Sequence, residues 1–380
     1  MKLGISYEQA LAKARPGLRY RMEQSVSLIR KAEALALRYD ADNGFFLAFS
    51  GGKDSQALYH IVQLAGVRFQ AHFSPTTVDP PQVIRFIRRN YQDVIFEKVD
   101  KSMFQVAKEM GMVPTMKLRW CCAKFKETAG AGRVTLTGIR RAESIKRAKR
   151  QSVEVSGHKF SGNLDEFMGW SKERIEKKVK NLNLDEFSRD KEQEIRCING
   201  KDSIIVNPML EWTDRDVWDF LNDVCQVPHC ELYDPPYNQH RIGCILCPMS
   251  SHRQKLKDCQ MYPHIKRKWL EVFEYFIGGG TLQSTETNRE VFTSRGGANL
   301  SSVRQPVVQT SGETTPPLRM YQDRARSIHR GGQRTRNGKP RWGKAGVSMS
   351  AQVLFDWWLT HDTWEEFKAK RELPSLFDED

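Results

Sequence analysis

Features that would place a chain in a membrane or in a secretory pathway are missing from this 380-residue sequence. No apolar run reaches the roughly 20 residues that a membrane-spanning helix needs. The opening residues, MKLGISYEQALAKARPG, contain no apolar signal-peptide core, and no internal repeat is apparent. We therefore expect a cytoplasmic protein with no membrane partner and no repeat architecture.

Acidic residues are outnumbered by basic ones, 46 to 60, which gives a net charge of +14 and a pI near 9.4. Such a surface attracts polyanions, and charge alone does not choose between nucleotides and nucleic acid. In a cytoplasmic chain the eight cysteines are expected to be reduced thiols, metal ligands or catalysts rather than a disulfide framework.

Short apolar segments alternate with helical ones from residue 45 onward. The predicted strands are 45–49, 68–73, 94–99, 134–138 and 204–206, and the first three are separated by predicted helices at 54–65 and 81–91. Parallel strands joined by helical crossovers form a doubly wound α/β sheet, which gathers ligands at the carboxyl ends of its strands. An amphipathic pattern at 16–40 predicts a helix packed in front of this sheet, and a later helix is expected at about 252–276.

A glycine pair interrupts the chain between the first strand and the first of these helices. The segment consists of Ser50, Gly51, Gly52, Lys53, Asp54 and Ser55. Its glycines let backbone amides approach an anion at a helix N-terminus, where the helix dipole favours negative charge. The hydroxyls and Lys53 add donors, and Asp54 either caps the helix or holds a metal ion. The pattern is not a Walker loop, and the alternative is an ordinary strand-to-helix turn.

Four cysteines stand in two pairs whose spacing suits metal ligands. Cys121 and Cys122 are adjacent, among basic residues that favour thiolates, and Cys244 and Cys247 form a C-x-x-C sequence. Four thiolates are the ligands of an iron–sulfur cluster and also suit zinc. The remaining alternative is that these cysteines are unrelated and simply buried.

Basic residues also follow the predicted strand 134–138. Arg140, Arg141 and Arg147 place guanidinium groups at the carboxyl end of that strand, where they could bind phosphate or sulfate in a bidentate manner. A solvated basic helix face is the alternative.

The SGGKDS sequence resembles the SGGxDS signature of PP-loop ATP pyrophosphatases, which have the adenine nucleotide α-hydrolase-like fold. Its lysine is similar to that of phosphoadenosine phosphosulfate (PAPS) reductases. The resemblance covers about residues 45–249. It implies that residues 50–55 bind an adenine nucleotide, either ATP with Mg²⁺ or a sulfonucleotide, and that Lys53 and Asp54 take part in catalysis.

Two further segments extend the resemblance. The tandem cysteines and the C-x-x-C sequence resemble the four-cysteine [4Fe-4S] ligand set of the adenylyl-sulfate reductase branch. Lys126 matches the lysine after the tandem pair there, whereas Phe125 departs from the usual arginine. The sequence G-x-R-x-x-x-S-x-x-R resembles the sulfonucleotide-binding segment, with these residues in matching positions: Gly138, Arg140, Ser144 and Arg147. The resemblance gives Arg140 and Arg147 catalytic roles.

One feature of the thiol-driven reductases is absent. Those enzymes carry a nucleophilic cysteine in a C-terminal Glu-Cys-Gly-Leu-His segment, whereas the only cysteine after Cys247 here is Cys259, in a helical context. We therefore expect chemistry at the α-phosphate, such as adenylation or sulfur transfer, rather than thiol-driven sulfite release.

The sequence predicts four parts: a helical N-terminal segment (1–44), a nucleotide-binding domain (45–277) with a charged insertion at about 157–196, a flexible basic linker (278–349) and a C-terminal helix (350–380). Within the linker, residues 319–344 are strongly basic. This tract predicts contact with DNA or RNA, and non-specific solubilising charge is the alternative.

The sequence thus favours a sulfur-transfer enzyme of the PAPS reductase family that binds an adenine nucleotide and a [4Fe-4S] cluster, with a thiol or sulfur-donor protein as partner. Two alternatives stay open. One is a nucleic-acid sulfur-modifying enzyme, as in relatives that thiolate tRNA or insert phosphorothioate into DNA. The other is a non-catalytic nucleotide-binding module.

Overall fold

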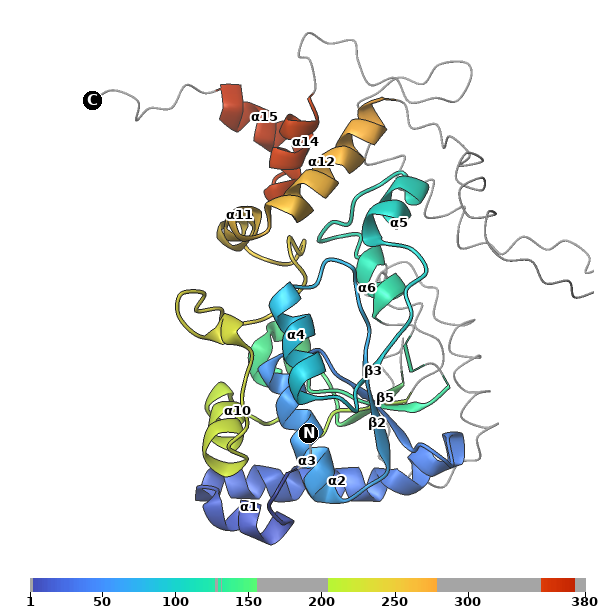
Figure 1. Ribbon diagram of the computed structural model, residues 1–380, viewed down its shortest axis with the longest axis vertical. Coiled ribbons are helices and arrows are strands. Elements are labelled where there is room, and N and C mark those ends of the chain that lie inside the picture. Colours follow the sequence, from blue (N-terminus) through green and yellow to red (C-terminus); the bar gives the residue numbers. More distant parts are fainter. Residues whose placement is uncertain (1–2, 127–128, 131, 156–203, 279–349, 373–380) are drawn as a thin grey trace, which may run out of the picture.

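The computed structural model describes residues 3–126, 129–130, 132–155, 204–278 and 350–372 (Figure 1). The predicted charged insertion, the basic tract at 319–344 and all but the first residue of the predicted linker lie outside the described residues.

A six-stranded sheet forms the centre of the molecule. Its strands are β1 (Phe45–Ala48), β2 (Phe69–Phe73), β3 (Ile95–Phe96), β4 (Val134–Leu136), β5 (Val153–Val155) and β6 (Ile204–Val206). They lie in the order β3-β2-β1-β4-β6-β5, and every neighbouring pair is parallel except β5 and β6. This mostly parallel sheet with flanking helices confirms the predicted α/β class. Because the strand order reverses at β1, the crevice beside its carboxyl end is where a ligand is expected.

Helices connect and flank these strands. In chain order they are α1 (Tyr7–Lys13), α2 (Pro16–Tyr39), α3 (Lys53–Ala65), α4 (Pro81–Asn90), α5 (Met103–Met110), α6 (Trp120–Phe125), α7 (Ile145–Ala148), α10 (Asp214–Asp219), α11 (His252–Met261), α12 (Pro263–Ile277), α14 (Ala351–Leu359) and α15 (Trp364–Glu372). Shorter helical turns are η1 (Arg141–Glu143), η4 (Phe220–Val224) and η5 (Glu231–Tyr233). In the described part of the chain, no helix combines the length and the apolar character needed to cross a membrane.

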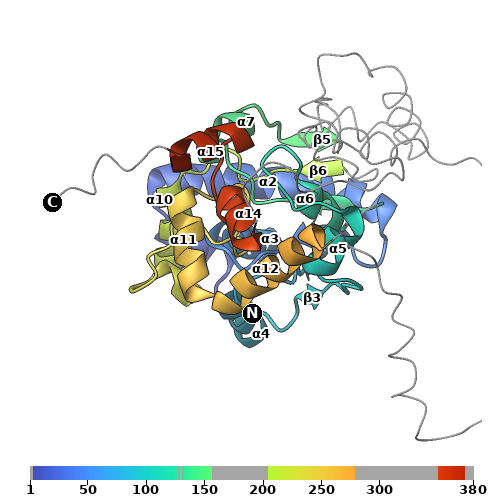
Figure 2. The same cartoon turned by 90° about the horizontal axis from the view of Figure 1, so that it is seen from above.

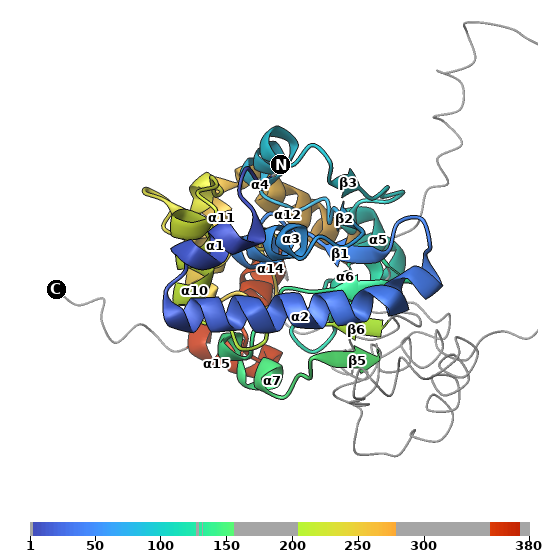
Figure 3. The ribbon, with the colours of Figure 1, turned by 90° about the horizontal axis from the view of Figure 1, so that it is seen from below.

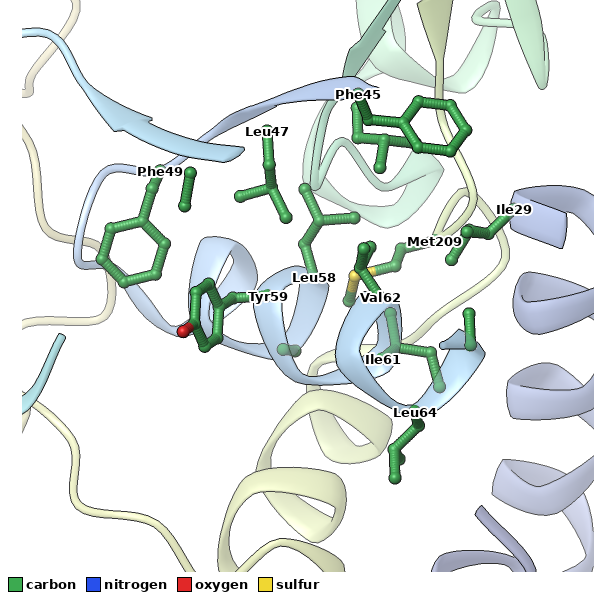
Figure 4. Packing of buried hydrophobic residues seen from close by; sticks show 14 of the residues in the cluster. Ile29, Phe45, Leu47, Phe49, Leu58, Tyr59, Ile61, Val62, Leu64 and Met209 are labelled. Atoms are coloured by element: carbon green, nitrogen blue, oxygen red, sulfur yellow. The ribbon is translucent and has the colours of Figure 1, made fainter. Parts of the chain in front are cut away.

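The helical N-terminal segment is packed against the sheet, as its amphipathic pattern predicts. The long helix α2 contacts α3, β1 and β4 (Figure 3). Apolar side chains of α3, among them Leu58 and Val62, fill the space between β1 and α2 (Figure 4). We call this apolar cluster of α2, α3 and β1 the first core. Its packing fixes the position of α3 and of the loop that enters this helix.

A second core lies beyond the carboxyl end of the sheet and is built largely from the C-terminal half of the chain. Aromatic side chains of α12 and α14 meet there, and both Cys121 and Leu246 belong to the same cluster. Figure 2 shows α14 lying beside α12, in agreement with their contacts. The predicted C-terminal aromatic helix thus docks on the protein's own core.

Three predicted elements differ from the structure. The strand expected at 94–99 is only Ile95–Phe96, because β3 is an edge strand with little apolar burial. The helix expected at 252–276 is divided between α11 and α12, since Pro263 cannot donate a backbone hydrogen bond and starts the second helix. Strand β5 was not expected, and the described C-terminal region contains two helices instead of one.

Candidate functional site

The SGGKDS segment, which we call the phosphate loop, forms a closed turn at the carboxyl end of β1. Gly51 has φ +72°, a left-handed conformation that favours glycine, and a Cβ there would lie 2.9 Å from Ile87 of α4. The Ser55 hydroxyl donates to the Gly52 carbonyl at 2.9 Å and accepts from the Ser50 amide at 3.1 Å. Both serines therefore hold the loop closed.

The backbone amides at the start of α3 point out of the helix. No side chain caps this helix, and its first backbone hydrogen bond runs from Gln56 N to Gly52 O. The amides of Lys53, Asp54 and Ser55 precede that bond and so have no acceptor within the helix. The Lys53 amide donates to the hydroxyl of Tyr233 at 2.8 Å. The loop thus presents the donors of an anion site, one of them in contact with a tyrosine.

Two buried cations and two carboxylates lie beside these amides. Lys53 Nζ is 3.2 Å from Asp54 Oδ2 and 3.1 Å from Asp214 Oδ1. Arg140 contacts the same two carboxylates, through Nε at 2.7 Å and Nη2 at 2.6 Å. Lys53 and Arg140 are only 5% and 2% exposed. Partial desolvation opposes ionisation of the mostly exposed Asp214, yet these cations lower the pKa of its carboxyl below the usual range. The four charges form one compensated network.

The segment after β4 approaches the loop closely at Gly138. A Cβ at that position would lie 2.8 Å from the Asp54 carbonyl oxygen, so only glycine fits without displacement. Ser144 is exposed and caps α7 by accepting from the Arg147 amide at 3.3 Å. Arg147 pairs with Glu143, which is also 3.9 Å from Arg241.

The two cysteine pairs meet at the edge of the second core. The four free thiols lie close enough together that ionisation of Cys122, Cys244 or Cys247 would raise the pKa of Cys121. Cationic groups donate to two of the sulfurs: Arg119 Nη2 to Cys122 Sγ at 3.1 Å, and Lys126 Nζ to Cys244 Sγ at 3.2 Å. Among the described residues, however, no three His, Cys, Asp or Glu side chains are arranged to hold a metal ion.

The thiols differ in their readiness to ionise. A hydrogen bond from Cys121 and the charge of Arg119 lower the pKa of Cys122 to about 5, against the desolvation that burial imposes. The same bond and burial raise the pKa of Cys121, and burial raises that of Cys247. The Cys244 sulfur in turn raises the pKa of Lys126. A thiolate and an ammonium are therefore both favoured at this edge.

Backbone contacts tie the C-x-x-C turn to its surroundings. The Ile245 amide donates to the Val78 carbonyl at 2.8 Å, and the Leu246 amide donates to Asp258 of α11 at 2.9 Å. Thr76, in the loop after β2, donates to Cys244 Sγ at 3.4 Å. The turn thus lies between the carboxyl end of β2 and the helices of the second core.

The structure therefore gathers most of the predicted residues into two neighbouring groups. The loop residues, Gly138 and Arg140 form the first, and the four cysteines form the second. Arg147 lies within reach of the charge of Asp54. The hydroxyl of Ser144 instead accepts from the Arg147 amide of its own short helix, α7. Sequence reasoning missed Asp214, Tyr233 and Arg241. Asp214 is the first residue of α10, and the sequence does indicate Thr213 as the cap of that helix. Nothing in the local sequence indicates that the Asp214 side chain reaches the phosphate loop.

Comparison with known proteins gives a family match and distant relatives. The model of the phosphoadenosine phosphosulfate reductase domain matches residues 44–250. The uncharacterized protein MJ0973 of Methanocaldococcus jannaschii is 24% identical over 271 residues, which cover 67% of this chain and 53% of that protein. The chain thus spans about half the length of this curated relative.

Solved structures with a similar arrangement include Candida glabrata FMN adenylyltransferase. In its complex with FMN and the ATP analog AMPCPP the identity is 14% and the TM-score 0.37, over 64% of this chain and 74% of that one. In its complex with ATP the identity is 14% and the TM-score 0.35, over 64% and 71%. The family match covers more than half of the 380 residues and includes the phosphate loop and all four cysteines, so the chain belongs to the phosphoadenosine phosphosulfate reductase domain family.

Proposed function

We propose that this protein is a cytoplasmic enzyme that binds an adenine nucleotide at the phosphate loop and acts at the α-phosphate, or at a sulfate attached to it, in sulfur transfer. The observation that carries the proposal is the place of the loop. Its amide donors, which have no acceptor within the helix, and Lys53 lie at the carboxyl end of β1, where the strand order reverses. Family membership supports the adenine nucleotide as ligand.

Each side chain has a distinct part in this proposal. The loop amides and Lys53 would stabilise the negative charge of a leaving pyrophosphate, because preorganised donors act where charge develops. Asp54, with Asp214 beside it, is suited to an Mg²⁺ ion that accompanies ATP, since Mg²⁺ binds one or two carboxylates and the substrate phosphates. Arg147, which lies within reach of the charge of Asp54, would supply a further cation for the phosphate or sulfate of the substrate.

We further propose that the four cysteines hold a [4Fe-4S] cluster. Two cationic donors already contact the sulfurs, as the negative charge of four thiolates requires. A cluster takes one thiolate for each of its four iron atoms, and the two cysteine pairs supply four thiols at the same edge of the second core. When bound, the cluster would supply electron transfer or a site for sulfur. Lys126 and Arg119 would then balance its charge.

A nucleic acid is the second candidate for the acceptor of the reaction. The basic sequence at 319–344 and the net charge of +14 favour a polyanionic partner. DNA or tRNA binding should then weaken steeply with salt and be lost when residues 319–344 are deleted. Lack of DNA or tRNA binding would remove this acceptor from consideration, and binding that the deletion leaves unchanged would show that residues 319–344 are not the contact.

Nucleotide binding is tested with two glycine variants that share one backbone strain. Gly51 and Gly66 have φ +72° and +71°, so alanine at either position costs stability, but only Gly51 lies in the phosphate loop. Gly51→Ala should lower the affinity for ATP or a sulfonucleotide at least about tenfold, whereas Gly66→Ala should leave it unchanged. Isothermal titration calorimetry measures both.

Equal affinities in the two glycine variants would show that residues 50–55 form only a structural turn. Turnover separates the enzyme from a non-catalytic module. If anaerobically purified protein forms no AMP, pyrophosphate or sulfite from ATP, adenylyl sulfate or PAPS, with DNA or tRNA and a sulfide donor present, the catalytic part of the proposal is wrong.

A further inference from the structure

Tyr233 is held against the phosphate loop by a segment far from it in sequence. The residue ends η5, whose backbone bond from Tyr233 N to Cys230 O measures 3.0 Å. Its ring packs edge-on against Trp218 with centroids 5.1 Å apart. Arg85 of α4 pairs with Glu231 at 3.3 Å, an exposed ion pair that joins the same turn to α4. The phenol is therefore fixed from two directions.

The hydroxyl of Tyr233 reaches the donors of the loop. It accepts from the Lys53 amide at 2.8 Å, and a Cβ on Gly52 would lie 3.3 Å from it. A phenol that accepts one hydrogen bond still has a proton to donate. Burial raises the pKa of Tyr233, so this proton is retained at neutral pH. The site thus contains a neutral donor whose oxygen already touches the first amide of α3.

We propose that Tyr233 is a phosphate-binding residue, whose hydroxyl donates to an oxygen of the phosphate group held by the Ser50–Ser55 loop while it accepts from the Lys53 amide. The proposal rests on the proposed function, because the ligand is the same adenine nucleotide. The Tyr233 hydroxyl adds a contact from η5, so that two separate segments of the chain bind one phosphate. Lys53, Asp54 and Tyr233 would then define where the phosphate lies.

A hydroxyl that competes with the phosphate and a hydroxyl that binds it predict opposite effects of its removal on nucleotide affinity. If the hydroxyl only takes the place of a phosphate oxygen on the Lys53 amide, the nucleotide must displace it, and removal of the hydroxyl should strengthen binding. If the hydroxyl is a donor to phosphate, its removal should weaken binding. Phenylalanine keeps the ring that packs on Trp218, so Tyr233→Phe isolates the hydroxyl.

The experiment compares wild type, Tyr233→Phe and the matched variant Tyr237→Phe, which alters a second tyrosine of the same segment. Each is titrated calorimetrically with ATP, PAPS and adenosine, and thermal unfolding is recorded. Hydrogen bonds to charged groups contribute about 1.5–3 kcal/mol, so Tyr233→Phe should weaken ATP or PAPS binding about 10- to 100-fold. Adenosine binding, and every affinity of Tyr237→Phe, should stay within about twofold of wild type.

Three outcomes would overturn the inference. Unchanged or tighter nucleotide binding in Tyr233→Phe would show that the hydroxyl only stabilises the loop or competes with the phosphate for the Lys53 amide. An equal loss for adenosine would show that it orders the site without contacting phosphate. If the folded wild-type protein bound neither ATP nor PAPS, the proposed function itself would fall, and that result is distinguishable because it appears before any substitution is made.

Discussion

Replacement of Trp358 by alanine should undock the C-terminal helix from the rest of the protein. This indole of α14 is 6% exposed and lies in the second core, with ring centroids 4.9 Å from Trp269 and 5.9 Å from Phe355. Its Nε1 also donates to the Pro114 carbonyl at 2.7 Å, just ahead of the segment that carries the tandem cysteines. One side chain therefore joins α14, α12 and that segment.

The magnitude follows from burial and from the lost hydrogen bond. Truncation of a buried tryptophan to alanine costs about 3–5 kcal/mol, because apolar contacts are lost and a cavity remains. That cost raises the population of the undocked helix roughly 10²- to 10⁴-fold. Trp358→Phe keeps most of the ring contacts but leaves the Pro114 carbonyl unpaired, which costs about 1–3 kcal/mol. Alanine should therefore be clearly the more damaging change.

Amide hydrogen exchange is the appropriate measurement, because it separates local undocking from global unfolding. Amides of α14 should exchange faster in Trp358→Ala than in Trp358→Phe, and faster in both variants than in wild type, because a larger cost populates the undocked helix more. The effect should be smaller in α12, while amides of β1 and α3 in the first core keep their protection. Wild-type exchange rates in the α14 amides of Trp358→Ala would show that the helix is not docked where the structure places it.

Three other changes test different parts of the molecule. Gly138→Ala should weaken ATP binding about tenfold and cost about 1–3 kcal/mol, since its Cβ would overlap the Asp54 carbonyl; wild-type values in calorimetry and urea titration would contradict that close approach. His60 is fully buried, and burial lowers its pKa from 6.5 to about 4, so the unfolded state takes up the proton first and stability is lost as the pH falls from 6.5 to 4. The loss is about 3 kcal/mol in urea unfolding, and it should vanish in His60→Gln. Anaerobically purified protein should contain about four iron and four sulfide per chain, and this content should fall when serine replaces any one of Cys121, Cys122, Cys244 and Cys247. Stoichiometric zinc without sulfide would replace the cluster by a structural zinc site.

The sequence predicted the phosphate loop because all of its determinants are local. An apolar run, a glycine pair and a following helix are adjacent, so the strand, the turn and the helix start could be placed within a few residues. Gly51 indeed occupies a left-handed turn. The parallel sheet was predictable for the same reason, because its strands and crossover helices alternate along the chain.

The remainder of the site depends on contacts between distant residues. Tyr233 reaches the Lys53 amide across 180 positions, and Trp358 reaches the Pro114 carbonyl across 244. No local pattern encodes such pairings, because they are decided by how whole elements pack. Arg140 is another residue whose partners the local sequence does not indicate. Its charge suggested an anion-binding group, but its partners in the structure are the carboxylates of Asp54 and Asp214.

The position of Cys259 bears on the expectation that the protein does not act as a thiol-driven sulfonucleotide reductase. Cys259 lies on α11, partly buried against the second core, and burial raises the pKa of its thiol. A packed thiol on a helix with a raised pKa is poorly suited to act as a mobile nucleophile, which is consistent with this expectation.

The central claim, chemistry at the α-phosphate of an adenine nucleotide, is tested most directly by product analysis. The anaerobically purified full chain is incubated separately with ATP, adenylyl sulfate and PAPS, together with reduced thioredoxin, a sulfide donor and DNA or tRNA. Cleavage at the α-phosphate, with AMP and pyrophosphate formed from ATP and no sulfite formed at an enzymatic rate, is the predicted result. Rapid sulfite release that is abolished in Cys259→Ser would contradict it and make Cys259 the nucleophile.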